Sequence, residues 1–363
     1  MRVSITSEDN FPGARFGPSY LSATLERALC CPVGEVECQA LQGDASNRTY
    51  FRTTFQKGAK PEVRGSVIVM QLQEAVPDPE TDFTRILKFL QGLDLPVPDL
   101  YHYDVENGLL FLEDCGTHTL EDHLCECPEE RTQFYRRAVE LLVQMQVRAT
   151  RALSPECPAY HLQFDVEKLM WEFDFMLEHY VEALCGSPLE ESVKREVRAA
   201  FLPLCETLAA EDLCFTHRDY HSRNLMVDGG RLVLLDFQDA RQGPCQYDLV
   251  SLLKDSYLQI DDALRDELVD LYICLREKEG GWEADREDFF RIFDWMSLQR
   301  NLKAVGTFAY QSVKKSNERY QGSIAPTLEY VRQTLDRRFR SSPLREVLMR
   351  YVPGLDGGGG GRS

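Results

Sequence analysis

The chain has 363 residues, of which 43% are hydrophobic and 28% are charged, and this globular composition argues against disorder over most of its length. Its 59 acidic residues against 41 Lys and Arg give a formal net charge of −18. Nucleic-acid backbones and anionic membranes attract basic surfaces, so neither is expected as a partner of this protein. At roughly 150 residues per domain, the length predicts two or three domains or lobes.

The 12 cysteines bear on the compartment and on metal binding. They form no Cys-x-x-Cys pair and no Cys/His zinc spacing, so we expect small buried side chains with some exposed thiols. The first residues lack the apolar core of a signal peptide, and no run approaches ~18 apolar residues. A cytoplasmic protein with reduced thiols is therefore expected. Because nothing in the pattern demands a protein partner, a monomer is expected.

Short β-branched and aromatic runs follow the first forty residues, which are poorly patterned apart from a helix expected over 19–29. Strands are predicted over 49–53 and 66–71, on either side of a Gly/Pro/Lys turn region. Apolar residues at helical spacing, between Phe83 and Leu90, then predict a helix. A last apolar strand is predicted over 109–112, before Glu113-Asp114-Cys115-Gly116 breaks the pattern.

Helical periodicity dominates the rest of the chain. Apolar stripes predict helices that begin near residues 128 and 165, a third over 189–208, and further helices over 247–340. Among them, the turn signal Asp228-Gly229-Gly230 separates two apolar runs and predicts a β-hairpin.

These patterns together predict an α+β protein with two lobes. The smaller lobe, over residues 1–113, contains the strands of an antiparallel sheet. The larger lobe, over 114–353, is mainly helical. Residues 354–363 are glycine-rich and are predicted to form a flexible tail.

One stretch carries the pattern His-x-Asp-x-x-x-x-Asn, followed by the hairpin and an Asp-Phe pair. Phosphoryl transfer from ATP needs such groups at this spacing. Asp219 is predicted to orient the acceptor hydroxyl and take its proton, while Asn224 and Asp236 supply hard oxygen ligands for Mg²⁺. His217 is expected to be structural, and Asp248 to cap or brace the loop after Asp236.

This motif resembles that of the aminoglycoside phosphotransferase and choline kinase superfamily. Further segments are similar to the bacterial anomeric kinases of N-acetylmuramate and N-acetylglucosamine, which act in peptidoglycan recycling. The resemblance covers about residues 43–320, and its segments are Gly-Asp-Ala-Ser-Asn-Arg-Thr-Tyr-Phe-Arg (43–52), Leu-Glu-Asp-Cys-Gly (112–116), 235–240, 247–255 and 300–308. It implies a two-lobed protein-kinase-like fold, ATP and Mg²⁺ as cofactors, and a sugar phosphorylated at its C1 hydroxyl. The smaller lobe, over 1–113, would then contain the nucleotide phosphate-binding loop, and the larger lobe, over 114–353, the catalytic and substrate-binding residues.

The resemblance also implies where the nucleotide binds. Ser46, Arg48 and Arg52 are expected at the phosphates, because the strand over 66–71 lacks the lysine that protein kinases use there. A solvated strand face is the alternative for the two arginines. The adenine is expected to meet main-chain groups from Glu113 to Cys115.

Sugar-binding residues are the least constrained by the sequence. Asp239 follows the metal-binding aspartate by three residues, and Arg300 and Lys303 offer cations for the carboxylate of N-acetylmuramate. For each of these residues alone, a mixed-charge surface position is slightly favoured. Trp171 and Glu172 lie on a predicted helix that could line the same site.

Three other functions remain open on the same residues. A cationic aminoglycoside or choline acceptor would suit an acidic protein. A protein kinase is disfavoured by Asp236-Phe237-Gln238 in place of Asp-Phe-Gly and by the absence of an Ala-Pro-Glu segment. A catalytically silent nucleotide-binding protein is disfavoured because all three predicted catalytic and metal residues are present.

Overall fold

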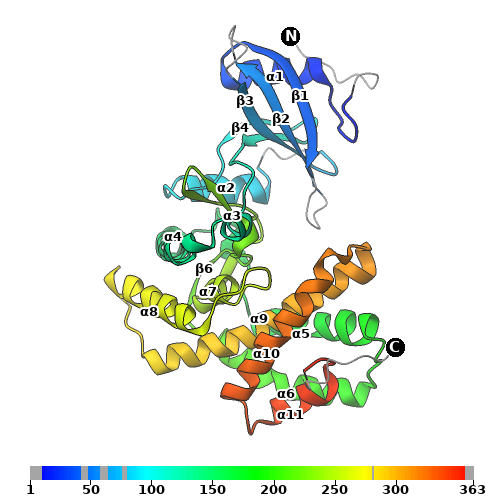
Figure 1. Ribbon diagram of the computed structural model, residues 1–363, viewed down its shortest axis with the longest axis vertical. Coiled ribbons are helices and arrows are strands. Elements are labelled where there is room, and N and C mark those ends of the chain that lie inside the picture. Colours follow the sequence, from blue (N-terminus) through cyan, green and yellow to red (C-terminus); the bar gives the residue numbers. More distant parts are fainter. Residues whose placement is uncertain (1–9, 42–47, 58–63, 76–79, 280–281, 356–363) are drawn as a thin grey trace. The chain divides into compact units, whose positions relative to one another are not determined.

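The computed structural model describes residues 10–41, 48–57, 64–75, 80–279 and 282–355 (Figure 1). The chain divides into two compact units. Unit 1 comprises Met1–Thr84 and Val97–Gly116, and unit 2 comprises Arg85–Pro96 and Thr117–Ser363.

A five-stranded antiparallel sheet forms the body of unit 1. Its order is β1-β2-β3-β5-β4. The strands predicted near residues 49, 66 and 109 are confirmed, whereas the strands at the two edges of the sheet escaped prediction because polar side chains interrupt both. The bounds are β1 (Val33–Leu41), β2 (Thr49–Lys57), β3 (Arg64–Gln71), β4 (Leu100–Asp104) and β5 (Leu109–Glu113).

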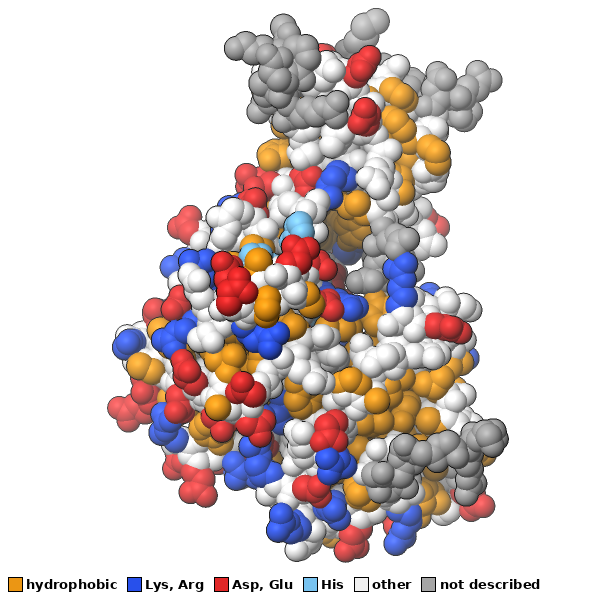
Figure 2. All heavy atoms as spheres, viewed as in Figure 1, with side chains coloured by type: hydrophobic (Ala, Val, Ile, Leu, Met, Phe, Trp, Pro, Cys, Tyr) orange, Lys and Arg blue, Asp and Glu red, His pale blue; other side chains and the backbone are white. Residues whose placement is uncertain are grey.

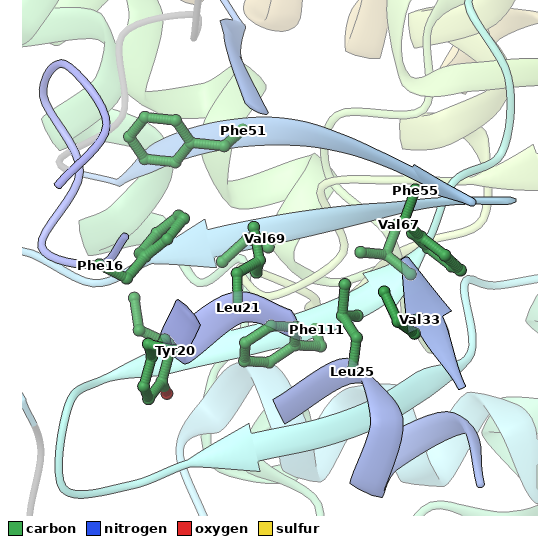
Figure 3. Close-up of a cluster of buried hydrophobic side chains, with 11 residues drawn as sticks. Phe16, Tyr20, Leu21, Leu25, Val33, Phe51, Phe55, Val67, Val69 and Phe111 are labelled. Carbon is green, nitrogen blue, oxygen red and sulfur yellow. The ribbon is translucent and has the colours of Figure 1, made fainter. Parts of the chain in front are cut away.

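Helix α1 (Pro18–Leu29) packs on one face of this sheet, and the helix predicted over 19–29 is thereby confirmed. Figure 3 shows Tyr20, Leu21 and Leu25 of the helix directed at strand residues that alternate with period two. The rings of Phe16 and Phe51 meet edge to face, with centroids 5.3 Å apart. The buried cluster comprises Phe16, Tyr20, Leu21, Leu25, Val33, Phe51, Phe55, Val67, Val69, Leu109 and Phe111.

Unit 2 is mainly helical, and the predicted α+β class is confirmed. Two short antiparallel ribbons accompany the helices, β6 (Leu213–Thr216) with β9 (Arg241–Pro244) and β7 (Leu225–Asp228) with β8 (Arg231–Leu234). The second ribbon is the predicted hairpin. The helices are α2 (Asp82–Gln91, shared with unit 1), α3 (Leu120–Glu126), α4 (Arg131–Ala152), α5 (Val166–Met176), α6 (Glu191–Ala209), α7 (Gln246–Leu253), α8 (Asp262–Lys278), α9 (Arg286–Lys315), α10 (Ile324–Arg338) and α11 (Pro343–Tyr351), with a π-helical segment over Leu177–Leu184.

Helix α9, the longest of these helices, lies along α5 and α10 (Figure 1). Gly306 permits a close approach to α5, because a Cβ atom at this position would lie 2.7 Å from the Cα of Met176. Asp165 and Asp285 cap the first turns of α5 and α9 by accepting backbone N–H bonds.

The surface of unit 2 carries charges of both signs, and the cysteines are unpaired. In Figure 2, acidic and basic side chains are intermixed over the helices of unit 2 in the lower part of the view. All 12 cysteines are free, five of them buried. Within the described ranges, no helix has both the length and the apolarity needed to cross a membrane.

Candidate active site

The predicted catalytic residue Asp219 lies on the loop between β6 and β7. Its carboxylate pairs with the Lys303 ammonium of α9, with 3.2 Å between Oδ1 and Nζ, and the Asp219 side chain is 24% exposed. Burial alone would raise the pKa of Asp219, but Lys303, Arg218 and other nearby cations outweigh it and hold the pKa below its usual range. Asp219 is therefore an ionised, partly accessible carboxylate at neutral pH.

Two buried carboxylates at α7 hold this loop in place. Asp248 accepts the backbone N–H bonds of His217 (2.7 Å) and Arg218 (2.9 Å), and Asp255 accepts that of Ser222 (2.9 Å). Burial raises the pKa of Asp248 to about 7, against the opposing effect of the two N–H bonds. The prediction that Asp248 braces the loop after Asp236 is wrong. Because α7 packs behind the earlier loop, this carboxylate reaches the residues that precede Asp219.

Two residues of the site have left-handed backbone conformations that residues other than glycine rarely adopt. Arg218 has φ of 82° and Asp236 has φ of 62°. Such strain persists only where the surroundings over-determine the conformation, and it is typical of functional sites. At Arg218, the N–H bond to Asp248 is one of the contacts that hold it.

The two predicted metal-binding residues lie close together. The backbone of Asn224 accepts an N–H bond from Leu235, which directly precedes Asp236, at 2.9 Å. The Asn224 side-chain NH₂ group donates to the backbone carbonyl of Asp219, also at 2.9 Å. The side-chain carbonyl oxygen of Asn224 can therefore act as an acceptor or as a metal ligand. Asp236 is exposed and accepts a bond from Gln238 at 2.6 Å.

This donor set fits Mg²⁺, which binds through one or two carboxylates together with substrate phosphates and water. Within the described residues, no cluster of three or more His, Cys, Asp and Glu could hold a metal ion without such help.

The two histidines of the loop are neutral in the folded protein. Burial lowers the pKa of His217 to about 4 and that of His221 to about 3. His217 is 1% exposed, in keeping with its expected structural role. His221 is half-buried, and its ring lies against Tyr257 with centroids 5.4 Å apart.

Helix α9 is not the mixed-charge surface helix that was slightly favoured for its predicted sugar-binding residues. Arg300 is 5% exposed and donates to the hydroxyl of Ser251. Lys303 is 14% exposed and faces Asp219. The helical pattern did not predict the burial of these two cations, because charged residues normally mark the exposed face of a helix, whereas here they lie on a face that packs inside unit 2. Asp239 is 56% exposed and pairs with Arg218 at 3.2 Å.

In unit 1, the predicted nucleotide-binding residues have the following places. Ser46 lies outside the described residues. Arg48 lies over the ring of Phe83, 5.5 Å from its centroid. Arg52 binds both carboxylate oxygens of Asp114, at 2.8 and 2.9 Å, and the carbonyl of Gly116 at 2.5 Å.

The expected adenine-binding segment follows β5 in unit 1. The N–H of Glu113 donates to the carbonyl of Asp99 at 2.8 Å. Cys115 is buried, and its thiol lies 3.8 Å from the carbonyl of Glu113.

Helix α5 contributes a residue pair that the sequence suggested and a cation that it did not. Trp171 is 52% exposed, whereas Glu172 is 1% exposed and accepts a bond from Gln299 at 3.1 Å. The unpredicted residue is Lys168, whose ammonium lies 3.5 Å from Glu172. The sequence did contain a signal for this pair. Lys168 precedes Glu172 by one helical turn, and Glu172 lies among apolar residues, so an ion pair could have been predicted.

Two curated proteins are similar to most of this chain. The N-acetylmuramate/N-acetylglucosamine kinase of Neisseria meningitidis serogroup B is 31% identical over 319 residues, which are 85% of this chain and 89% of that protein. The protein of the same name from Pseudomonas aeruginosa is 30% identical over 325 residues, 86% of this chain and 88% of that one.

Similarity to solved structures shows the same fold at low identity. The structure of choline kinase from Cryptosporidium parvum Iowa II has a TM-score of 0.56 and 9% identity, and the match covers 89% of this chain and 93% of that chain. The predicted protein-kinase-like fold is thereby confirmed. Residues 37–290 match the phosphotransferase enzyme family. This chain belongs to that family.

Proposed function

We propose that this phosphotransferase is an ATP-dependent kinase that phosphorylates the C1 hydroxyl of N-acetylmuramate, N-acetylglucosamine or both. The observation that carries the proposal is the ionised Asp219 carboxylate, paired with Lys303 on a loop that Asp248 holds from behind. The names of the two relatives support the choice of sugars. We further propose that the enzyme acts as a monomer in the cytoplasm, where its product feeds peptidoglycan recycling toward UDP-sugars.

In this proposal Asp219 acts mainly by orienting the acceptor. A carboxylate with a lowered pKa stays ionised and is a weak base, so it accepts a hydrogen bond from the hydroxyl, aligns it and takes the proton late. The sugar oxygen forms a bond to the γ-phosphorus of ATP, and the bond from that phosphorus to the β,γ-bridging oxygen breaks. ADP leaves, and the hydroxyl proton passes to Asp219.

Lys303 supplies positive charge beside the reacting hydroxyl. Its ammonium, 3.2 Å from Asp219, keeps the carboxylate ionised and can stabilise negative charge on the transferred phosphoryl group. This cation supplies part of the positive charge that protein kinases obtain from a lysine in the strand that corresponds to β3.

For the nucleotide, we propose the sequence-derived assignments. Ser46, Arg48 and Arg52 contact the phosphates, and main-chain groups of Glu113 and Cys115 meet the adenine. Asn224 and Asp236 would hold Mg²⁺, which neutralises phosphate charge when bound. The bidentate pair of Arg52 with Asp114 supports at least a positioning role for this arginine beside the adenine-binding segment.

ADP release tests the proposal with both sugars, their 1-O-methyl glycosides, an aminoglycoside and choline as acceptors. We expect activity on one or both free sugars and none on the methyl glycosides, because these lack the anomeric hydroxyl. Asp219→Asn should lower kcat by at least ~1,000-fold and retain nucleotide binding. Asp228→Asn, at the end of β7 and paired with Arg231, is the matched control and should behave like the parent. Equal turnover of the methyl glycosides, or turnover of only choline or the aminoglycoside, would refute the assignment.

A further inference from the structure

Three cationic side chains from separate elements of unit 2 gather around Glu172 and Asp239, and one of them belongs to the residue that precedes Asp219. Lys168 belongs to α5, Arg218 directly precedes Asp219 on the catalytic loop, and Arg241 begins β9. Shared acidic residues link them: Lys168 and Arg218 both contact Glu172, while Arg218 pairs with the Asp239 carboxylate and Arg241 donates to the Asp239 backbone carbonyl at 3.3 Å. Burial, and then the proximity of Arg218 and Arg241, lower the pKa of Lys168 against the opposing effect of Glu172.

The acidic partners of these cations do not neutralise them. Glu172 is a buried carboxylate, and its contacts with these side chains are loose, at 3.5 Å to Lys168 and 4.0 Å to Arg218. Asp239 accepts from Arg218 at 3.2 Å but is 56% exposed. Asp219 also attracts Arg218, but its carboxylate is shared with Lys303. With that pair included, four positive charges face three negative charges, of which Asp239 is solvated. The buried Nε of Arg218 has no hydrogen-bond partner among the described residues.

Two of these cations, Lys168 and Arg218, remain partly accessible to a ligand. The side chain of Lys168 is 23% exposed and that of Arg218 is 17% exposed. The Lys168 ammonium lies 3.8 Å from the centroid of the Trp171 ring, and this contact with an exposed aromatic side chain orients it. Arg241 is 8% exposed and lies over the ring of Phe164, 5.1 Å from its centroid.

We propose that Lys168, Arg218 and Arg241 form a carboxylate-binding subsite for the acceptor, which takes the lactyl carboxylate of N-acetylmuramate. This inference rests on the proposed function and assigns its substrate preference. Arginine holds a carboxylate through a planar fork of N–H donors, and an incompletely neutralised cation cluster favours an anion at low desolvation penalty.

The other cations near Asp219 are already engaged. Arg300 is buried and bonded to Ser251, and Lys303 is paired with Asp219 itself. The positive φ of Arg218 is a second indication, because a glycine would adopt this conformation without strain. Retention of a long cationic side chain at such a position is explained if that side chain binds the substrate.

Steady-state kinetics with both sugars test the subsite, because N-acetylglucosamine lacks the lactyl carboxylate and serves as an internal reference. Lys168→Met removes the charge and keeps an unbranched side chain beside Trp171. We expect its kcat/KM for N-acetylmuramate to fall about 10- to 100-fold more than its kcat/KM for N-acetylglucosamine, as for the loss of one charge-assisted contact. Lys194→Met, which removes a cation paired with Glu182 on the surface, should leave the ratio at the parent value.

A second measurement compares N-acetylmuramate with its methyl ester, which lacks the negative charge of the carboxylate. In the parent enzyme, kcat/KM for the ester should fall below that for the acid by a similar factor, and this comparison does not depend on the folding of any variant. In Lys168→Met, kcat/KM for the ester should change little from its value in the parent enzyme. Equal losses for both sugars in Lys168→Met, or an ester as good as the acid in the parent, would overturn the subsite. Inactivity of the parent on both sugars would instead refute the proposed function.

Discussion

Replacement of Gly306 by alanine tests the close packing of α9 against α5. An added Cβ would lie 2.7 Å from the Cα of Met176 and 3.0 Å from its backbone nitrogen. Because these are mainly backbone atoms, no side-chain rotation relieves the clash. The helices must separate locally by about 0.7 Å for the closest contact to reach an ordinary 3.4 Å.

The expected free-energy change combines two opposing effects. Alanine is favoured over glycine in a helix by about 1 kcal/mol, whereas overpacking costs about 1–3 kcal/mol. A clash with backbone belongs at the upper end of that range, so we expect a net loss of about 2 kcal/mol. At about 2–4 °C for each kcal/mol in a domain of this size, the melting temperature should fall by about 4–8 °C.

Thermal unfolding followed by circular dichroism measures the effect, with Gly322→Ala as the matched control. No atom lies within 4 Å of a Cβ built at Gly322, and its backbone has no positive φ. We expect this control to melt at or slightly above the parent temperature. A Gly306→Ala variant that melts as high as the parent would show that helix propensity dominates and would refute the close-packing argument.

Two further predictions concern the loop between β6 and β7 that carries Asp219. At pH 8, Asp248→Asn should lower the free energy of unfolding by about 2–4 kcal/mol, because an amide can accept only one of the two N–H bonds at its place; kcat should fall at least ~10-fold as the loop loosens. Asp261→Asn, an exposed helix cap, should change neither quantity, and an Asp248→Asn variant as stable and active as that control would contradict the bracing role. Stability should also decline as the pH falls from about 6.5 to about 4, because the unfolded chain protonates its histidines while His217 and His221 stay neutral in the fold. Urea unfolding at successive pH values measures this, His221→Gln should flatten the decline, and an unchanged slope in that variant would count against the assignment.

Local patterns in the sequence were enough for most helices and for the inner strands. Periodicity of 3.6 residues identified α4, α5 and α6, and β-branched runs identified β2, β3 and β5. The edge strands β1 and β4 were missed because one partner strand and partial exposure impose little hydrophobic pattern on a strand. The ribbon of β6 and β9 was missed for a different reason, since its strands are short and come from distant parts of the chain.

The sequence by itself determined the candidate reaction, because Asp219, Asn224 and Asp236 carry their chemistry in one short stretch. Only the tertiary structure decided what surrounds them. Lys303 reaches Asp219 across 84 residues, and Asp248 reaches the catalytic loop from a helix that follows it. Such pairings depend on the path of the chain, whereas periodicity records only which face of an element is buried. A charged residue on a helix therefore reads as a surface residue until the fold places its partner.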